Sequence, residues 1–112
     1  MLSPMPFFAD PGAMEAMRVA PRRQVSIPAE VSSSALGHVR VDVSDISRLG
    51  CRAEINCRLV PGDFVMVRLP GLAPMGARVA WGKSTAAGLS FLAPLAAPVL
   101  AALLARYPRA PD

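Results

Sequence analysis

The sequence has few of the residues on which several common kinds of protein depend. Two cysteines and one histidine occur in 112 residues, so neither a disulfide framework nor an ordinary zinc site is expected. Aromatic residues make up 5%, so the core must be built mainly from aliphatic side chains. A single lysine accompanies eleven arginines, and guanidinium groups suit phosphates and guanine edges better than lysine does.

Long apolar runs are also missing. The longest, residues 93–105, contains Pro94 and Pro98 and is too short to span a bilayer. The first 17 residues have no basic segment followed by an apolar one, so no secretory signal is expected. We therefore expect a cytoplasmic protein without membrane insertion, in which Cys51 and Cys57 are reduced thiols.

The charge is positive but modest. A net charge of +4 favours a small anionic ligand over a long polyphosphate chain. A barrel that binds single-stranded nucleic acid normally exposes aromatic residues for base stacking. Here Phe64, Trp81 and Phe91 fall in the alternation typical of a core, so binding to DNA or RNA is not expected.

Apolar residues recur with period two over most of the chain, which predicts strands in one small domain. Pro28 lacks an amide donor and is expected at an edge or a bulge. Residues 45–50 and Pro61-Gly62-Asp63 are expected breaks. Six short strands at this spacing predict a closed or nearly closed barrel, and they are expected at residues 24–31, 38–44, 51–56, 64–69, 77–81 and 88–92.

The end of the chain follows a helical period instead. Leucine and valine residues between 95 and 104 predict a helix of about ten residues that packs its apolar stripe on the barrel. Pro98 is tolerable in its first turn. We expect residues 1–17 to be a flexible leader, 18–106 the domain and 107–112 a tail.

Signatures of catalysis are missing. The sequence has no glycine-rich phosphate loop, no metal-ligand spacing and no nucleophile elbow. His38 is expected to face solvent from a strand. Asp42 and Asp45 would point to different faces of an extended chain and so make a poor acid–base pair. We expect a protein that is not an enzyme and that uses no metal or cofactor.

Two segments could carry binding chemistry. In the first, Arg18, Arg22 and Arg23 could grip phosphates and reach the N7 and O6 acceptors of guanine. Pro21 keeps the preceding residue out of a helix, so these arginines are expected in an extended or turned segment. The same residues are also compatible with a solvated basic linker.

The second segment is Asp45-Ile46-Ser47-Arg48-Leu49-Gly50, at a junction between strands. The Asp45 carboxylate could accept from the N1–H and N2–H₂ donors of guanine, and the Ser47 hydroxyl could donate or accept. Gly50 would permit positive φ and close approach of the backbone to a ligand. A plain turn, in which Asp45 and Ser47 bond to nearby amides, is the alternative.

The two segments in this order resemble the PilZ family. The stretch 18–29 (RVAPRRQVSIPA) is similar to the opening of its domain, and 45–52 (DISRLGCR) to its second motif. Pro61-Gly62-Asp63 resembles the mid-domain turn, and Trp81 with residues 88–91 the final hairpin. The resemblance spans residues 18 to about 104.

This resemblance implies a six-stranded antiparallel β-barrel with a C-terminal α-helix that binds cyclic di-GMP. Arg18 and Arg22 would hold phosphates and guanine, while Asp45, Ser47 and Gly50 would cradle one guanine base. Arg23 follows the second motif arginine and would either reinforce this anion site or be exposed. The chain would act as a receptor and adaptor, ordering its N-terminal arginine arm and signalling to an unidentified partner protein. The alternative is a ligand-free PilZ-like interaction module in motility or pilus machinery.

Overall fold

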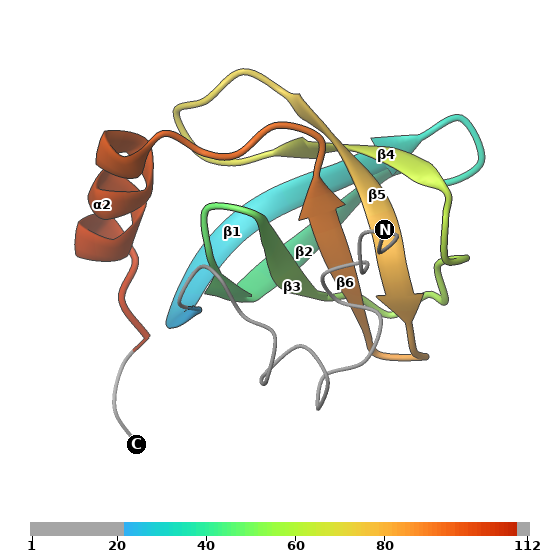
Figure 1. The fold of residues 1–112 in the computed structure, drawn as a ribbon. Coiled ribbons are helices and arrows are strands. Elements are labelled where there is room, and N and C mark those ends of the chain that lie inside the picture. Colours follow the sequence, from blue (N-terminus) through green and yellow to red (C-terminus); the bar gives the residue numbers. More distant parts are fainter. Residues whose placement is uncertain (1–21, 110–112) are drawn as a thin grey trace, which may run out of the picture.

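The computed structural model describes residues 22–109, which form a closed barrel of six antiparallel strands followed by a helix (Figure 1). Around the barrel the order is β1-β2-β3-β6-β5-β4, and β4 closes it by pairing with β1. The predicted six-stranded barrel with a C-terminal helix is confirmed. Its elements are β1 (Arg23–Ser33), β2 (Gly37–Ile46), β3 (Gly50–Glu54), β4 (Phe64–Arg68), β5 (Met75–Gly82), β6 (Ala86–Phe91) and α2 (Ala97–Arg106).

The interior is filled by the aliphatic residues whose alternation predicts the strands. Val25, Ile27 and Val31 of β1 have no exposed surface. Val43 of β2 and Leu89 of β6 are buried to the same extent. Complete burial of one such side chain stabilises the folded state by about 1.5–3 kcal/mol. The inner face therefore holds the barrel together.

Two details of the strands differ from the prediction. β2 continues to Ile46, so Asp45 lies in a strand and the break before β3 is only residues 47–49. Phe64, which the alternation places in the core, is 44% exposed. Val65 and Val67 take the inward positions of β4, and successive side chains of a strand point to opposite faces, so Phe64 lies outside.

Pro28 lies at a local edge of the sheet, as predicted. It pairs with Asp42 of β2, while the segment of β1 that pairs with β4 is Glu30–Ser32. The missing amide therefore leaves the pairing between β1 and β4 intact.

Helix α2 packs on the barrel next to the start of β1 (Figure 1). Pro98 occupies the first turn, where no amide donor is required. Leu103 is buried against the core, which confirms the predicted apolar stripe. Beyond the helix, the Ser26 amide donates to the carbonyl oxygen of Tyr107 at 3.1 Å. This bond attaches the end of α2 to Ser26 of β1, three residues after Arg23, where β1 begins.

The described range, residues 22–109, contains no helix with the length and apolar character needed to cross a bilayer.

Candidate functional site

The candidate site starts where the pairing of β1, β2 and β3 becomes irregular. The register between β1 and β2 shifts between Gln24 and Ile27, and the register between β2 and β3 shifts between Val43 and Asp45. Such a bulge adds a residue to one strand and turns the following side chain to the other face. As a result Asp45 lies directly opposite Arg52, on the outside of the barrel.

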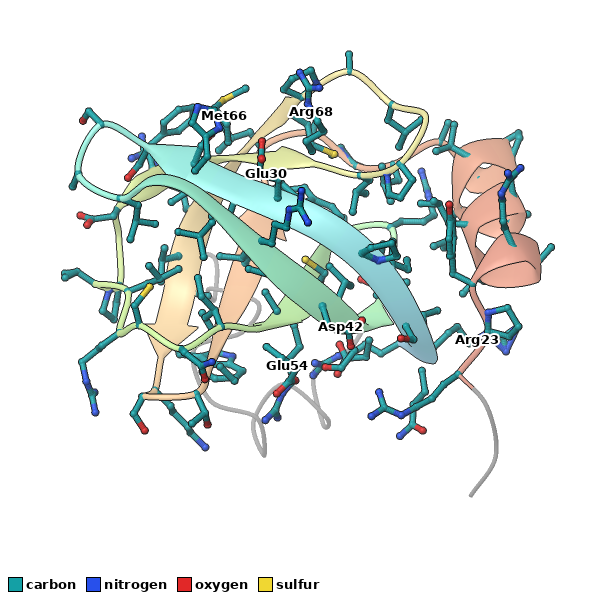
Figure 2. The ribbon with its side chains drawn as sticks, turned by 180° about the vertical axis from the view of Figure 1, so that it is seen from behind. Arg23, Glu30, Asp42, Glu54, Met66 and Arg68 are labelled. Carbon is teal, nitrogen blue, oxygen red and sulfur yellow. The ribbon has the colours of Figure 1, made fainter. Side chains whose placement is uncertain are left out.

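This bulge overturns one sequence expectation. Without it, Asp42 and Asp45 would point to different faces. In the structure Asp42 pairs with Glu54, and Asp45 pairs with Arg52 two residues earlier on β3. Glu54 and Arg52 flank the buried Ala53, so all four polar residues belong to the outer face. Figure 2 shows Asp42 and Glu54 together on this side of the barrel.

Two of the predicted site residues meet in an ion pair. Nε of Arg22 donates to Oδ1 of Asp45 at 3.0 Å, and Nη2 donates to the same oxygen at 2.6 Å. The side chains are only 15% and 20% exposed, respectively. Contacts of this kind between ionised groups are stronger than neutral hydrogen bonds. The pair joins the first motif to the second across 23 residues of sequence.

Ser47 closes the turn between β2 and β3. Its amide donates to the carbonyl oxygen of Gly50 at 2.9 Å, and its Oγ accepts from the amide of Leu49 at 3.0 Å. The side chain is 3% exposed. The local bond is the one that the plain-turn alternative predicts for Ser47, whereas Asp45 is bonded to Arg22 instead of a nearby amide.

Gly50 could have adopted positive φ but does not. Within residues 22–109, positive φ occurs at Gly37, Gly62 and Gly71, and Gly50 is not among them. Gly50 is the first residue of β3, is buried, and pairs with Ser90 of β6. It therefore has the extended backbone of a strand and does not use the positive φ that glycine permits.

Arg23 does not join the pair. Arg23, the first residue of β1, is exposed and lies away from Asp42 and Glu54 in Figure 2. Arg18 lies outside the described residues. Of the six predicted site residues, the structure brings together Arg22 and Asp45 by direct contact and places Ser47 and Gly50 in the adjoining turn.

The face beside Asp45 carries a further row of residues that the sequence interpretation missed. We call Asp45, Arg52, Gly88 and Trp81 the outer row, because they are paired neighbours across β2, β3, β6 and β5. The alternation of β5 predicts Trp81 in the core with Val79. Trp81 is buried as predicted, at 8% exposed, but a register shift between these two residues places it opposite Gly88, so it packs with Ala86 and Ala80 in a cluster separate from that of Val79.

Trp81 is covered by cations. The guanidinium carbon of Arg52 is 5.5 Å from the centre of the ring, and Nζ of Lys83 is 5.4 Å from it. Arg52 is held from the other direction by Glu54, whose Oε2 accepts from its Nε at 2.9 Å. No signal in the sequence separates this arrangement from an ordinary core tryptophan.

One buried group lies beneath the ion pair. Burial raises the pKa of the Cys51 thiol to about 12, the Asp45 carboxylate adds to the rise, and the Arg22 guanidinium opposes it. Cys51 has no exposed surface. The thiol therefore serves as apolar packing under the site rather than as a nucleophile. Among residues 22–109, no three His, Cys, Asp or Glu side chains are grouped so that they could hold a metal ion.

The family model of the PilZ domain matches residues 17–107 of the 112-residue chain. The chain belongs to the PilZ domain family. A search of curated protein sequences finds no match. PilZ domains form a family of cyclic di-GMP receptors, and the resemblance inferred from the two motifs is confirmed. Arg22, Asp45, Ser47 and Gly50 of this PilZ domain all lie within the matched range.

Proposed function

We propose that this PilZ domain is a cytoplasmic receptor and adaptor that binds cyclic di-GMP on the outer face around Arg22 and Asp45. The observation that supports it best is the direct contact of Arg22 with Asp45, which places a guanidinium and a carboxylate at one point of the surface. Phosphates and the N7 and O6 atoms of guanine require the first group. The N1–H and N2–H₂ donors of guanine require the second.

The ion pair indicates which bonds the ligand would have to replace. Oδ1 of Asp45 already accepts two bonds from Arg22, and a guanine that donates from both N1 and N2 needs both carboxylate oxygens. Binding therefore exchanges the Arg22 bonds to Oδ1 for guanine bonds. Arg22 would then turn toward a phosphate. The exchange replaces one set of charge-assisted bonds by another, so the net gain comes from the new phosphate contacts.

The arginine arm and the partner belong to the same proposal. Arg18 would join Arg22 and Arg23 around the phosphates, so that ligand binding orders the segment from Arg18 to Arg23. Ordering of a segment is a common way to create a surface that another protein reads. Limited proteolysis after these arginines should slow when cyclic di-GMP is added. Unchanged cleavage would contradict the ordering step.

A ligand-free interaction module is the second candidate, and one observation favours it. Asp45 and Ser47 are both bonded within the protein, Asp45 to Arg22 and Ser47 to the amide of Leu49. In that case the two motifs would only stabilise the turn. The two functions differ in a single measurable property, the binding of the nucleotide.

The experiment is isothermal titration calorimetry with cyclic di-GMP, cyclic di-AMP and GTP. We expect selective binding of cyclic di-GMP, because adenine has no N1–H donor for Asp45. Asp45→Ala and Arg22→Ala should each weaken binding by roughly ten- to a hundredfold, which corresponds to the loss of about 1.5–3 kcal/mol.

The matched control is Arg40→Ala on β2. Arg40 is exposed and pairs with Glu30, away from the outer row, so its removal should leave the affinity unchanged. Equal affinity for the two cyclic dinucleotides, or no heat with either at high micromolar concentration, would refute the receptor and leave the ligand-free module.

A further inference from the structure

Two hollows adjoin on the side of the barrel formed by β1, β4 and α2. One, of about 400 Å³, is lined by residues of β1, β2 and β4, and the other, of about 630 Å³, by residues of α2. Pro70, Gly71 and Leu72 of the connection between β4 and β5 line both. Neither hollow includes a residue of the outer row. We call the two together the helix groove.

The first hollow carries an excess of positive charge. Arg40 and Arg68 line it on either side of Glu30, which pairs with both of them in register. Glu30 is bonded elsewhere, to Nδ1 of His38 at 3.1 Å. Within residues 22–109 neither Arg40 nor Arg68 forms an ion pair or a side-chain hydrogen bond. Figure 2 shows Glu30 and Arg68 far along the barrel from Arg23.

The second hollow is mainly apolar. Leu72 and Val99 pack against the core with part of their surface exposed, and Leu103 forms the floor between them. Ala102 is exposed on α2, so no larger side chain fills the space above it. Arg106, in the last turn of the helix, adds a third guanidinium at the rim.

We propose that the helix groove is the docking site for a short segment of a partner protein that combines acidic and apolar side chains. Charge complementarity selects the acidic part, because two arginines without ion pairs face one glutamate in the first hollow. The apolar part follows from the second hollow, where a leucine-sized or aromatic anchor would cover Leu72, Val99 and Leu103. Central apolar anchors with charged neighbours are typical of peptide-binding grooves.

The position of α2 gives this groove a connection to the nucleotide site, and this step rests on the proposed function. The Tyr107 carbonyl oxygen accepts from the Ser26 amide, and Arg109 donates to the carbonyl oxygen of Val25 at 3.3 Å. These bonds attach the end of α2 to the strand that begins beside Arg22. On the other side, the Arg48 carbonyl oxygen accepts from the Leu95 amide at 2.7 Å, which links the motif turn to the approach to α2.

The test uses the full chain without nucleotide. Random twelve-residue peptides displayed on phage are selected on the immobilised protein, and the enriched peptides are synthesised and titrated. We expect enrichment of peptides with both acidic and apolar residues. Arg68→Glu and Ala102→Arg should each weaken their binding at least tenfold, the first by reversing the charge and the second by filling the apolar hollow.

The matched control is Arg58→Glu, the same charge change at an exposed residue between β3 and β4 that lines neither hollow. It should change peptide affinity less than twofold. The proposal is overturned if nothing is enriched, if the enriched peptides lack acidic residues, or if they bind Arg68→Glu as well as the original protein. Because no nucleotide is present, failure of cyclic di-GMP binding leaves this result unaffected.

Discussion

The inner face of the barrel and the outer row are built from the same strands but follow different rules. On the inner face, alternate residues are mainly aliphatic and are buried. In the outer row, Asp45 and Trp81 reach their partners because a register shift precedes each of them. Regular alternation therefore provides the stability, while the candidate site depends on departures from it.

The largest effect is expected on the inner face. Leu89 lies between Val79 and Cys51 with no exposed surface, so Leu89→Ala leaves a cavity in the barrel. The free energy of unfolding should fall by about 2–5 kcal/mol. Urea denaturation followed by circular dichroism measures it. Leu92→Ala, at a residue 58% exposed, is the control and should cost less than about 1 kcal/mol. Equal losses would contradict an interior held by alternation.

Trp81 tests whether the outer row behaves like the core. A tryptophan in a barrel interior would cost about 3–5 kcal/mol on truncation to alanine. Trp81 is buried in a smaller cluster, with Ala86 and Ala80, and the side chains of Arg52 and Lys83 lie over its ring and could fill part of the space it leaves. We therefore expect Trp81→Ala to lower the free energy of unfolding by about 2 kcal/mol, including the lost cation–π contacts. A loss equal to that of Leu89→Ala would mean that Trp81 stabilises the fold as much as a side chain of the main core cluster does.

The fold was predictable because several residues in each strand indicate the same buried face. Each strand carries several inward aliphatic residues, such as Val25, Ile27 and Val31 on β1, and a shift of one residue would expose all of them. The helix was predictable from its leucine spacing and from the tolerated Pro98. The strands and the helix are both encoded by local patterns that persist over many residues.

The site was predictable only in part. Arg22 and Asp45 could be named because they belong to motifs. Their ion pair, however, depends on a bulge that no residue type in the sequence predicts. The same kind of bulge separates the buried Trp81 from the main core cluster and places it under Arg52. A single inserted residue moves every later side chain of the strand to the opposite face of the sheet. The alternation therefore predicts the face of a residue inside a regular strand but fails next to the site, where the bulges lie.

The Arg22–Asp45 ion pair should contribute less to the free energy of unfolding than Leu89→Ala or Trp81→Ala removes. A double-mutant cycle of Arg22→Ala and Asp45→Ala, measured by urea denaturation without ligand, should give a coupling of about 1 kcal/mol, because both side chains are mostly buried. The control cycle uses Arg52 and Glu54, whose side chains are 38% and 40% exposed and are screened by water. It should give less than about 0.5 kcal/mol. Equal coupling energies would mean that burial does not strengthen the motif pair.

The smallest effect concerns the reactivity of the two thiols. Cys51 is buried and Cys57 is partly exposed, and both are free. Iodoacetamide at pH 8 should modify Cys57 in the folded protein and leave Cys51 unmodified until denaturant is added, as mass spectrometry of tryptic peptides would show. Rapid modification of Cys51 without denaturant would mean that the strands over it open readily.

The raised pKa of Cys51 gives this comparison a pH dependence. In the folded state the pKa is about 12, against an ordinary value of 9.0, so the folded state holds the proton more tightly than the unfolded state. The resulting stabilisation is complete below pH 9 and is lost as the pH rises toward 12. Cys51→Ala removes the titrating group, so its free energy of unfolding should decline less steeply between pH 9 and 11 than that of the original protein. The remaining decline in the variant measures the other basic and phenolic groups, and the difference between the two slopes isolates the thiol. Parallel slopes would show that Cys51 can ionise within the folded barrel, which a thiol enclosed by the inner face should not do.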